Sequence, residues 1–258
     1  MPSAQRAAGR AVEQDPQLAE AHRVLGVVLH YSYDPWGAER ELRRALRLRP
    51  DLAEARAWFA YNVLAIAFGR FDEAIEEVSK ARRADPLSGS AASYQGFVLS
   101  TAGRHAAAVE AALEGAELDP DSTLAHLALM NTYLGAGRVA EAVVIGLGAL
   151  RTVGRPPFLS AMAASCHVAR GRMEDARTLH EELVARAAES YVQESVLAWT
   201  AAAIGRGAEA IEHADRAWQA RDPVLPLILQ RFGPTEPVRQ VLRDAGRYDE
   251  FLSRLGLA

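Results

Sequence analysis

The feature that most constrains this chain is a period of 34 residues. Glycine–arginine pairs occur at positions 69–70, 103–104, 137–138, 171–172 and 205–206, each 34 residues after the one before. In a second register, alanine recurs at positions 38, 74, 108, 142, 176 and 210, with spacings of 36, 34, 34, 34 and 34 residues. A fixed period of this length indicates an array of stacked supersecondary units, each of which buries its apolar side against its neighbours.

Each recurring residue type has a mechanical role in a helical hairpin. Glycine adopts the positive φ that ends one helix and turns the chain sharply into the next. Small alanines let two helices approach closely, where a larger side chain would overpack the contact. Asp-Pro pairs, as at 85–86 and 119–120, separate one hairpin from the next because proline disfavours helix in the residue before it. Alternating β-branched runs and Asn-Gly turns are absent from the sequence, so we predict an all-α protein.

A 34-residue unit with these marks resembles the tetratricopeptide repeat. The repeat's pattern is present as Leu25-Gly26…Ala38…Leu42…Ala45…Pro50, and again as Gly96…Ala108…Ala112…Pro120. The resemblance implies a right-handed α-solenoid of about six helix–turn–helix repeats, at residues 19–52, 53–88, 89–122, 123–156, 157–190 and 191–223. The second unit is two residues longer than the period, and we place the extra residues in its first helix between Trp58 and Phe68.

Both ends of the chain depart from the repeat. Residues 1–18 have the alanine spacing of a second helix, which predicts a half-repeat that caps the array. Residues 224–258 contain three prolines and end in an amphipathic segment around Phe251 and Leu255, which predicts an irregular helical cap. This tail and the segment 31–42 resemble the tetratricopeptide modules attached to bacterial winged-helix regulators, adenylate cyclases and protein kinases.

Composition indicates the cellular compartment of the protein and excludes some classes of binding partner. The net charge of −4 creates no field that would attract nucleic acid or an anionic membrane. No apolar run approaches the roughly 18 residues of a membrane span, and the N-terminus lacks the apolar segment of a secretion signal. Cys166 is the only cysteine, which excludes a disulfide framework, and Lys80 is the only lysine, as in proteins from GC-rich bacterial genomes. We expect a bacterial, cytoplasmic protein.

Catalytic and metal-binding motifs are weak. Residues 135–140 match G-x-G-x-x-A, but they lie in a predicted hairpin turn and do not follow a strand, as a dinucleotide site requires. The seven histidines are scattered and lack metal-ligand spacing. We therefore predict no enzymatic activity, no metal and no cofactor. An enzyme assembled from Cys166, His167 and Glu194 of neighbouring units is the least favoured alternative.

The concave face of the predicted solenoid is the remaining candidate for function. The first helix of each repeat lines this groove, and aromatic and arginine side chains there are typical anchors of protein interfaces. An asparagine amide can in addition hold a peptide backbone. Placing the units in register puts ten residues in the groove: Arg23, His30, Trp58, Tyr61, Asn62, Tyr94, Phe97, Asn131, Met162 and Trp199.

We therefore predict a protein-interaction scaffold that binds an apolar or aromatic peptide segment, or a partner domain, in its groove. The alternative hypothesis is a detached regulatory or ligand-sensing module of a bacterial signalling protein, which the half-repeat and the tail suggest. In either case the expected partner is a protein or peptide, without direct binding to nucleic acid or membrane. Pairing of two copies through terminal repeats is a further expectation.

Overall fold

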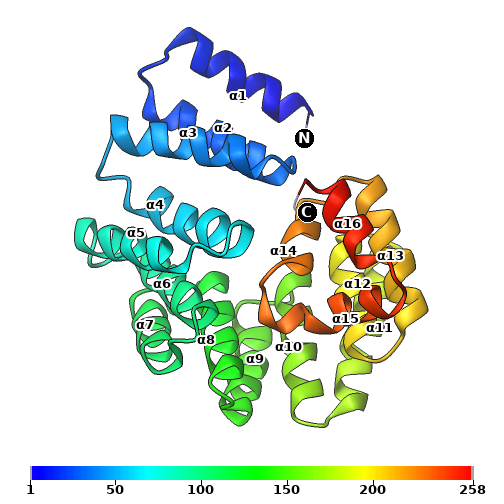
Figure 1. Cartoon of the computed structure of the whole chain (residues 1–258). Coiled ribbons are helices and arrows are strands. Elements are labelled where there is room, and N and C mark those ends of the chain that lie inside the picture. Colours follow the sequence, from blue (N-terminus) through cyan, green and yellow to red (C-terminus); the bar gives the residue numbers. More distant parts are fainter. Residues whose placement is uncertain (1, 257–258) are drawn as a thin grey trace.

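The computed structural model describes residues 2–256 and contains helices and no strand within that range. Six helical hairpins follow one another along an arc (Figure 1). They are α2 (Ala19–Tyr31) with α3 (Pro35–Leu48), α4 (Ala53–Phe59) and η1 (Ala60–Ala67) with α5 (Phe71–Ala84), α6 (Gly89–Thr101) with α7 (His105–Leu118), α8 (Thr123–Gly135) with α9 (Val139–Thr152), α10 (Pro157–Ala169) with α11 (Met173–Ala187), and α12 (Glu194–Ala203) with α13 (Gly207–Gln219). The prediction of an all-α chain of paired helices is confirmed.

One helix precedes the six hairpins, and shorter helices follow them. Helix α1 (Pro2–Gln14) packs against α2. After the last hairpin come α14 (Leu225–Leu229), the 3₁₀ turn η2 (Gly233–Thr235), α15 (Glu236–Asp244) and α16 (Tyr248–Arg254). Among the helices of residues 2–256, none combines the length and the apolar character that a bilayer crossing requires.

The turns inside the hairpins confirm the role assigned to the repeated glycines. All five have a φ between 65° and 82°: Gly69, Gly103, Gly137, Gly171 and Gly205. In the first hairpin Tyr33 occupies this place with a φ of 70°. This conformation is strained for a residue with a Cβ atom, so other contacts must stabilise Tyr33 in it.

Small residues set the distance between paired helices. The six repeated alanines are at most 1% exposed, so all of them are packed inside the array. A Cβ added at Gly26 would lie 2.6 Å from Cγ of Leu42, and one at Gly96 would lie 3.0 Å from Cβ of Ala112. Such distances leave no room for a larger side chain, which is why the repeat requires these residue types.

The second unit accommodates its extra residues in a π-helix. Helix α4 and η1 together span fifteen residues, two more than the thirteen of α6. A π-helix forms i→i+5 hydrogen bonds and so wraps more residues into each turn than an α-helix does. The insertion between Trp58 and Phe68 is therefore confirmed, and it leaves Gly69 in the turn where the register requires it.

The residues after the last hairpin, 224–256, are called the tail below, and they turn back across the inside of the arc (Figure 1). Helix α14 contacts η1 of the second repeat, and η2 contacts α8 of the fourth. The Tyr33 hydroxyl donates a hydrogen bond to the Asp222 carbonyl oxygen at 2.7 Å, and the Tyr33 ring stacks on Trp218 with centroids 5.9 Å apart. The first and sixth repeats thus meet, and the arc is closed.

Candidate functional site

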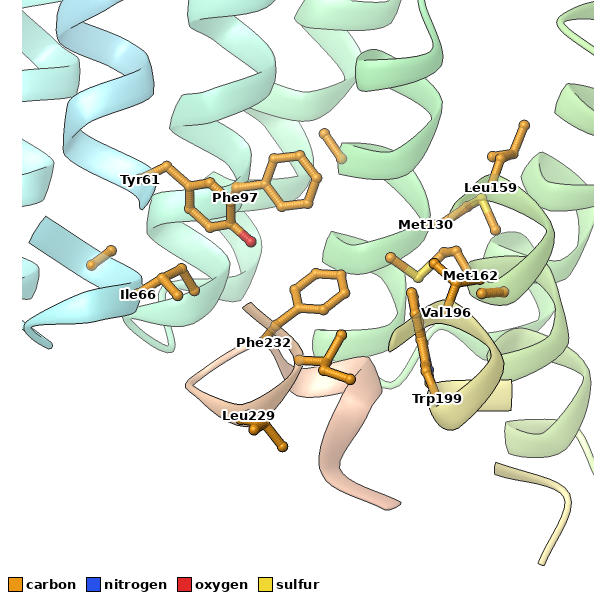
Figure 2. Packing of buried hydrophobic residues seen from close by; sticks show 14 of the residues in the cluster. Tyr61, Ile66, Phe97, Met130, Leu159, Met162, Val196, Trp199, Leu229 and Phe232 are labelled. Atoms are coloured by element: carbon orange, nitrogen blue, oxygen red, sulfur yellow. The ribbon is translucent and has the colours of Figure 1, made fainter. Parts of the chain in front are cut away.

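The tail occupies the inner face of the later repeats. Phe232 is 2% exposed, and its ring centroid lies 5.9 Å from that of Phe158 and 5.6 Å from that of Trp199. Figure 2 shows Phe232 between Tyr61 and Phe97 on one side and Met162 and Trp199 on the other. Trp199 Nε1 donates a hydrogen bond to the Pro234 carbonyl oxygen at 3.0 Å. The tail therefore covers this surface much as a bound peptide would.

Arg231 fastens the tail to the second repeat. Its Nη1 donates to the carbonyl oxygens of Ile66, at 2.8 Å, and Ala67, at 3.1 Å. These carbonyls lie at the end of η1, where helical carbonyls lack partners within their own helix. A Cβ added at Gly69 would lie 2.9 Å from Arg231 Nε, so the turn glycine also makes space for this contact.

The repeat register in the sequence did not predict these contacts of the tail. The sequence signal for them is the Arg-Phe pair placed between two prolines of the tail.

Six of the ten predicted groove residues are buried, and they include His30 and Asn131, which are described below. Met162 and Trp199 are 0% exposed, Phe97 is 4% exposed and Tyr61 is 5% exposed. Tyr61 and Phe97 stack on each other with centroids 4.8 Å apart. The expectation that these four side chains face an open groove is corrected, because neighbouring helices and the tail cover them (Figure 2).

Aromatic side chains with exposed surface remain on the first three repeats. Tyr31, Trp58 and Tyr94 are partly buried, and they are called the aromatic row below. The Trp58 ring lies 6.0 Å from that of Tyr31 and 5.2 Å from that of His30, which is 9% exposed. Asn62 Nδ2 donates to the Trp58 carbonyl oxygen at 3.1 Å, so this predicted residue lies beside the row. Register analysis placed Trp58 and Tyr94 here but missed Tyr31.

A cleft of about 390 Å³ between α2 and α4 shares Trp58 with the row. Arg23 and Arg49 both pair with Glu20, and the Arg23 hydrogen bond lowers the pKa of that carboxyl group. Two arginines line the cleft against four carboxylates: Glu20, Asp51, Glu54 and Asp85. The cleft therefore carries net negative charge. The predicted groove residue Arg23 already forms an ion pair with Glu20 of the same chain.

Asn131 lies apart from the aromatic row. It is 6% exposed and lines a larger cavity of about 520 Å³ between α6, α8 and α10 on one side and the tail on the other. The predicted groove residues therefore fall into three groups. One group lies at the aromatic row and the adjoining cleft, a second is buried, and Asn131 lines this separate cavity.

The hypothetical catalytic residues are not brought together. Cys166 is 1% exposed, and burial raises the pKa of its thiol to about 12, so the nucleophilic thiolate is disfavoured at neutral pH. Glu194 pairs with His213 Nδ1 at 2.6 Å and with Arg216 Nε at 3.0 Å. Within residues 2–256 no hydrogen bond links Cys166, His167 and Glu194, and no group of three or more metal-ligating side chains is assembled.

Comparisons with known proteins agree with the helical repeat. No family model matches the chain. The small glutamine-rich tetratricopeptide repeat-containing protein 2 of Mycosarcoma maydis is 31% identical over 111 residues. That match covers 43% of this chain and 31% of the relative, so the chain spans less than a third of the relative's length.

Solved structures share the fold over longer stretches of this chain. A tetratricopeptide repeat protein from Parabacteroides merdae has a TM-score of 0.61 at 16% identity, over 93% of this chain and 90% of that one. PilW, a type IV pilus biogenesis factor, has a TM-score of 0.59 at 21% identity, over 74% and 86%. Yeast Tom70 has a TM-score of 0.60 at 15% identity, and the match covers this whole chain and 55% of Tom70. With its 34-residue period, its glycine turns and its paired helices, the chain has the fold of a tetratricopeptide-repeat protein.

Proposed function

We propose that this chain is a protein-interaction scaffold that binds an apolar or aromatic segment of a partner over the aromatic row and the adjoining cleft. Tetratricopeptide-repeat proteins generally mediate protein–protein interactions, so the fold suggests a protein partner. The observation that carries the proposal is the partial exposure of Trp58 and Tyr94, whereas the neighbouring aromatic side chains Tyr61 and Phe97 are buried.

The row has the properties of an interface anchor. Aromatic side chains contribute large contact areas at little entropic cost, and they are enriched among the residues that dominate binding energy. Contacts with His30 and Tyr61 hold Trp58 and Tyr94 in place before any partner arrives. A preorganised surface of this kind loses less conformational entropy when it binds.

The charge of the cleft specifies the partner further. Glu54 and Asp85 line it without a described ion pair, whereas Glu20 is compensated by two arginines. A partner segment with a lysine or arginine beside its apolar anchor would complement this surface. We expect such segments to bind more tightly at low ionic strength, because salt screens exposed charges.

Selection of displayed random peptides on the full chain tests the proposal. The enriched peptides should contain an aromatic or large aliphatic residue next to a basic one. The variant carrying Trp58→Ala and Tyr94→Ala should lose them, and Glu54→Lys should weaken their binding about tenfold, equivalent to about 1.4 kcal/mol.

The matched control is Tyr191→Ala, because Tyr191 is a tyrosine outside the row that is 76% exposed. It should leave peptide binding unchanged. Crosslinking in the native cells, followed by purification with the same variants, extends the test to the physiological partner. Equal recovery by the native chain and the Trp58→Ala, Tyr94→Ala variant would refute the proposal.

A further inference from the structure

The cavity of about 520 Å³ that Asn131 lines has the size of a small-molecule site, for which roughly 300–1,000 Å³ is typical. It shares no lining residue with the aromatic row. The repeat register explains its space. The position that holds Thr101 in the third repeat holds Gly135, Ala169 and Ala203 in the next three, so side-chain bulk is missing at three successive helices. The tail lines the other side of the cavity with residues between Arg231 and Pro237.

The lining is mainly apolar and includes a few directed polar groups. Leu134, Val168 and Pro237 provide apolar walls. Asn131 and Ser165 occupy the same register position on neighbouring helices and are both polar. Ser165 Oγ accepts a hydrogen bond from Trp199 Nε1 at 2.9 Å and keeps its own proton to donate. Within residues 2–256 the Asn131 side-chain amide has no hydrogen-bond partner, and its polar atoms are not fully buried, so they are free to bond to a ligand in the cavity that Asn131 lines.

The charge of the lining selects against cations. Arg231 and His105 are its ionisable residues, and no carboxylate lines the cavity. Arg231 Nη1 is occupied by two backbone carbonyls, whereas its Nε and Nη2 donate to no acceptor among residues 2–256. Arg231 also forms no ion pair within that range, and Glu236, which lines a neighbouring cleft with it, pairs with Arg239 and Arg243. A guanidinium with two unused donors is suited to a carboxylate.

We propose that this cavity binds a small amphipathic carboxylate. The carboxylate pairs with Arg231, the apolar body lies against Leu134 and Val168, and Asn131 and Ser165 hydrogen-bond to polar atoms of the ligand. The site is independent of the partner surface proposed above, and it gives the ligand-sensing hypothesis a defined location. Because repeats and tail both line it, the ligand bridges them and stabilises the closed arc.

Titration calorimetry of the full chain with octanoate, octylamine and 1-octanol tests this proposal, since the three probes differ in the charge of the head group. We expect one octanoate per chain, bound at least tenfold more tightly than octylamine. Arg231→Gln keeps a side-chain donor for the Ile66 carbonyl, and it should weaken octanoate about tenfold while leaving 1-octanol unchanged.

A second variant tests the location. Ala169 is exposed at the cavity, so Ala169→Phe should fill the space without disturbing the fold and should abolish binding of all three probes. Ala140→Phe is the matched control, because Ala140 is an exposed helical alanine that does not line the cavity. Octylamine binding as tightly as octanoate, or octanoate binding that survives Ala169→Phe, would overturn the proposal. So would no octanoate binding at all.

Discussion

The early and late repeats have the same helical hairpin, but they differ in how much of their inward-facing aromatic surface is exposed to solvent. Trp58 of the second repeat keeps exposed surface, whereas Trp199 of the sixth is 0% exposed. Both residues lie on first helices, and each contacts other aromatic rings. Trp199 is covered by Phe158 of α10 and by Phe232 of the tail, whereas Trp58 contacts the rings of His30 and Tyr31. Register thus predicts which side chains face inward, whereas the path of a non-repeating segment decides whether that surface is free.

The largest expected effect concerns the later repeats, whose inner face is covered by the tail. Phe232→Ala should lower the free energy of unfolding by about 3–5 kcal/mol, because it removes a buried aromatic ring and leaves a cavity. Tyr94→Ala on the open half should cost about 1–2 kcal/mol, since Tyr94 is only partly buried. Urea denaturation of both variants measures the difference. Equal losses would break the distinction between a covered and an open face.

The second effect is a pH dependence in the open half. His30 Nδ1 is buried without a hydrogen-bond partner, and burial lowers the pKa of His30 from 6.5 to about 4. Between pH 6.5 and 4 the unfolded chain therefore binds more protons at this residue than the folded chain does. Stability should consequently fall by about 3 kcal/mol as the pH drops through this window, and His30 should contribute no slope above it.

In the His30→Leu variant this loss of about 3 kcal/mol between pH 6.5 and 4 should be absent from a plot of unfolding free energy against pH. The exposed His105→Leu serves as its control. His180 in the late repeats differs from His30, because Thr200 Oγ1 and Glu209 Oε1 bond to its two ring nitrogens at 2.8 and 3.0 Å. If His30→Leu and the native chain lost stability in parallel on acidification, the assignment of this slope to His30 would fail.

A smaller effect tests the scaffold that both halves share. Ala142 is 0% exposed, and Ala142→Leu should overpack its helical hairpin and cost about 1–3 kcal/mol. Ala140→Leu, on the exposed side of the same helix, should stay within about 0.5 kcal/mol of the native chain. Thermal melts of the two variants make the comparison, and similar melting temperatures would show that the alanine register is misplaced.

The smallest effect concerns the junction between the two halves. Tyr33→Phe removes the hydrogen bond to the Asp222 carbonyl but keeps the ring that stacks on Trp218, so it should cost about 1 kcal/mol. Hydrogen exchange should then rise at the ends of the arc more than in α8. Uniform exchange along the chain would mean that this contact does not hold the arc closed.

The repeats could be predicted from the sequence because their determinants are local. The positive φ of Gly137, the close contact at Ala142 and the extra residues of the second unit each depend on neighbours within one or two repeats. The candidate site was predicted only in part. Trp58 and Tyr94 have exposed surface, whereas Met162 and Trp199 are fully buried.

Tertiary structure alone decided the closure of the arc. Tyr33 and Asp222 are 189 residues apart, and Arg231 and Ile66 are 165 apart, so no local pattern relates them. Small rotations accumulate from repeat to repeat, and their sum determines whether the ends of the array meet. The period therefore determined each hairpin and its inward side. The accumulated curvature and the path of the tail determined which part of that side stayed open, because both depend on contacts summed over the whole chain.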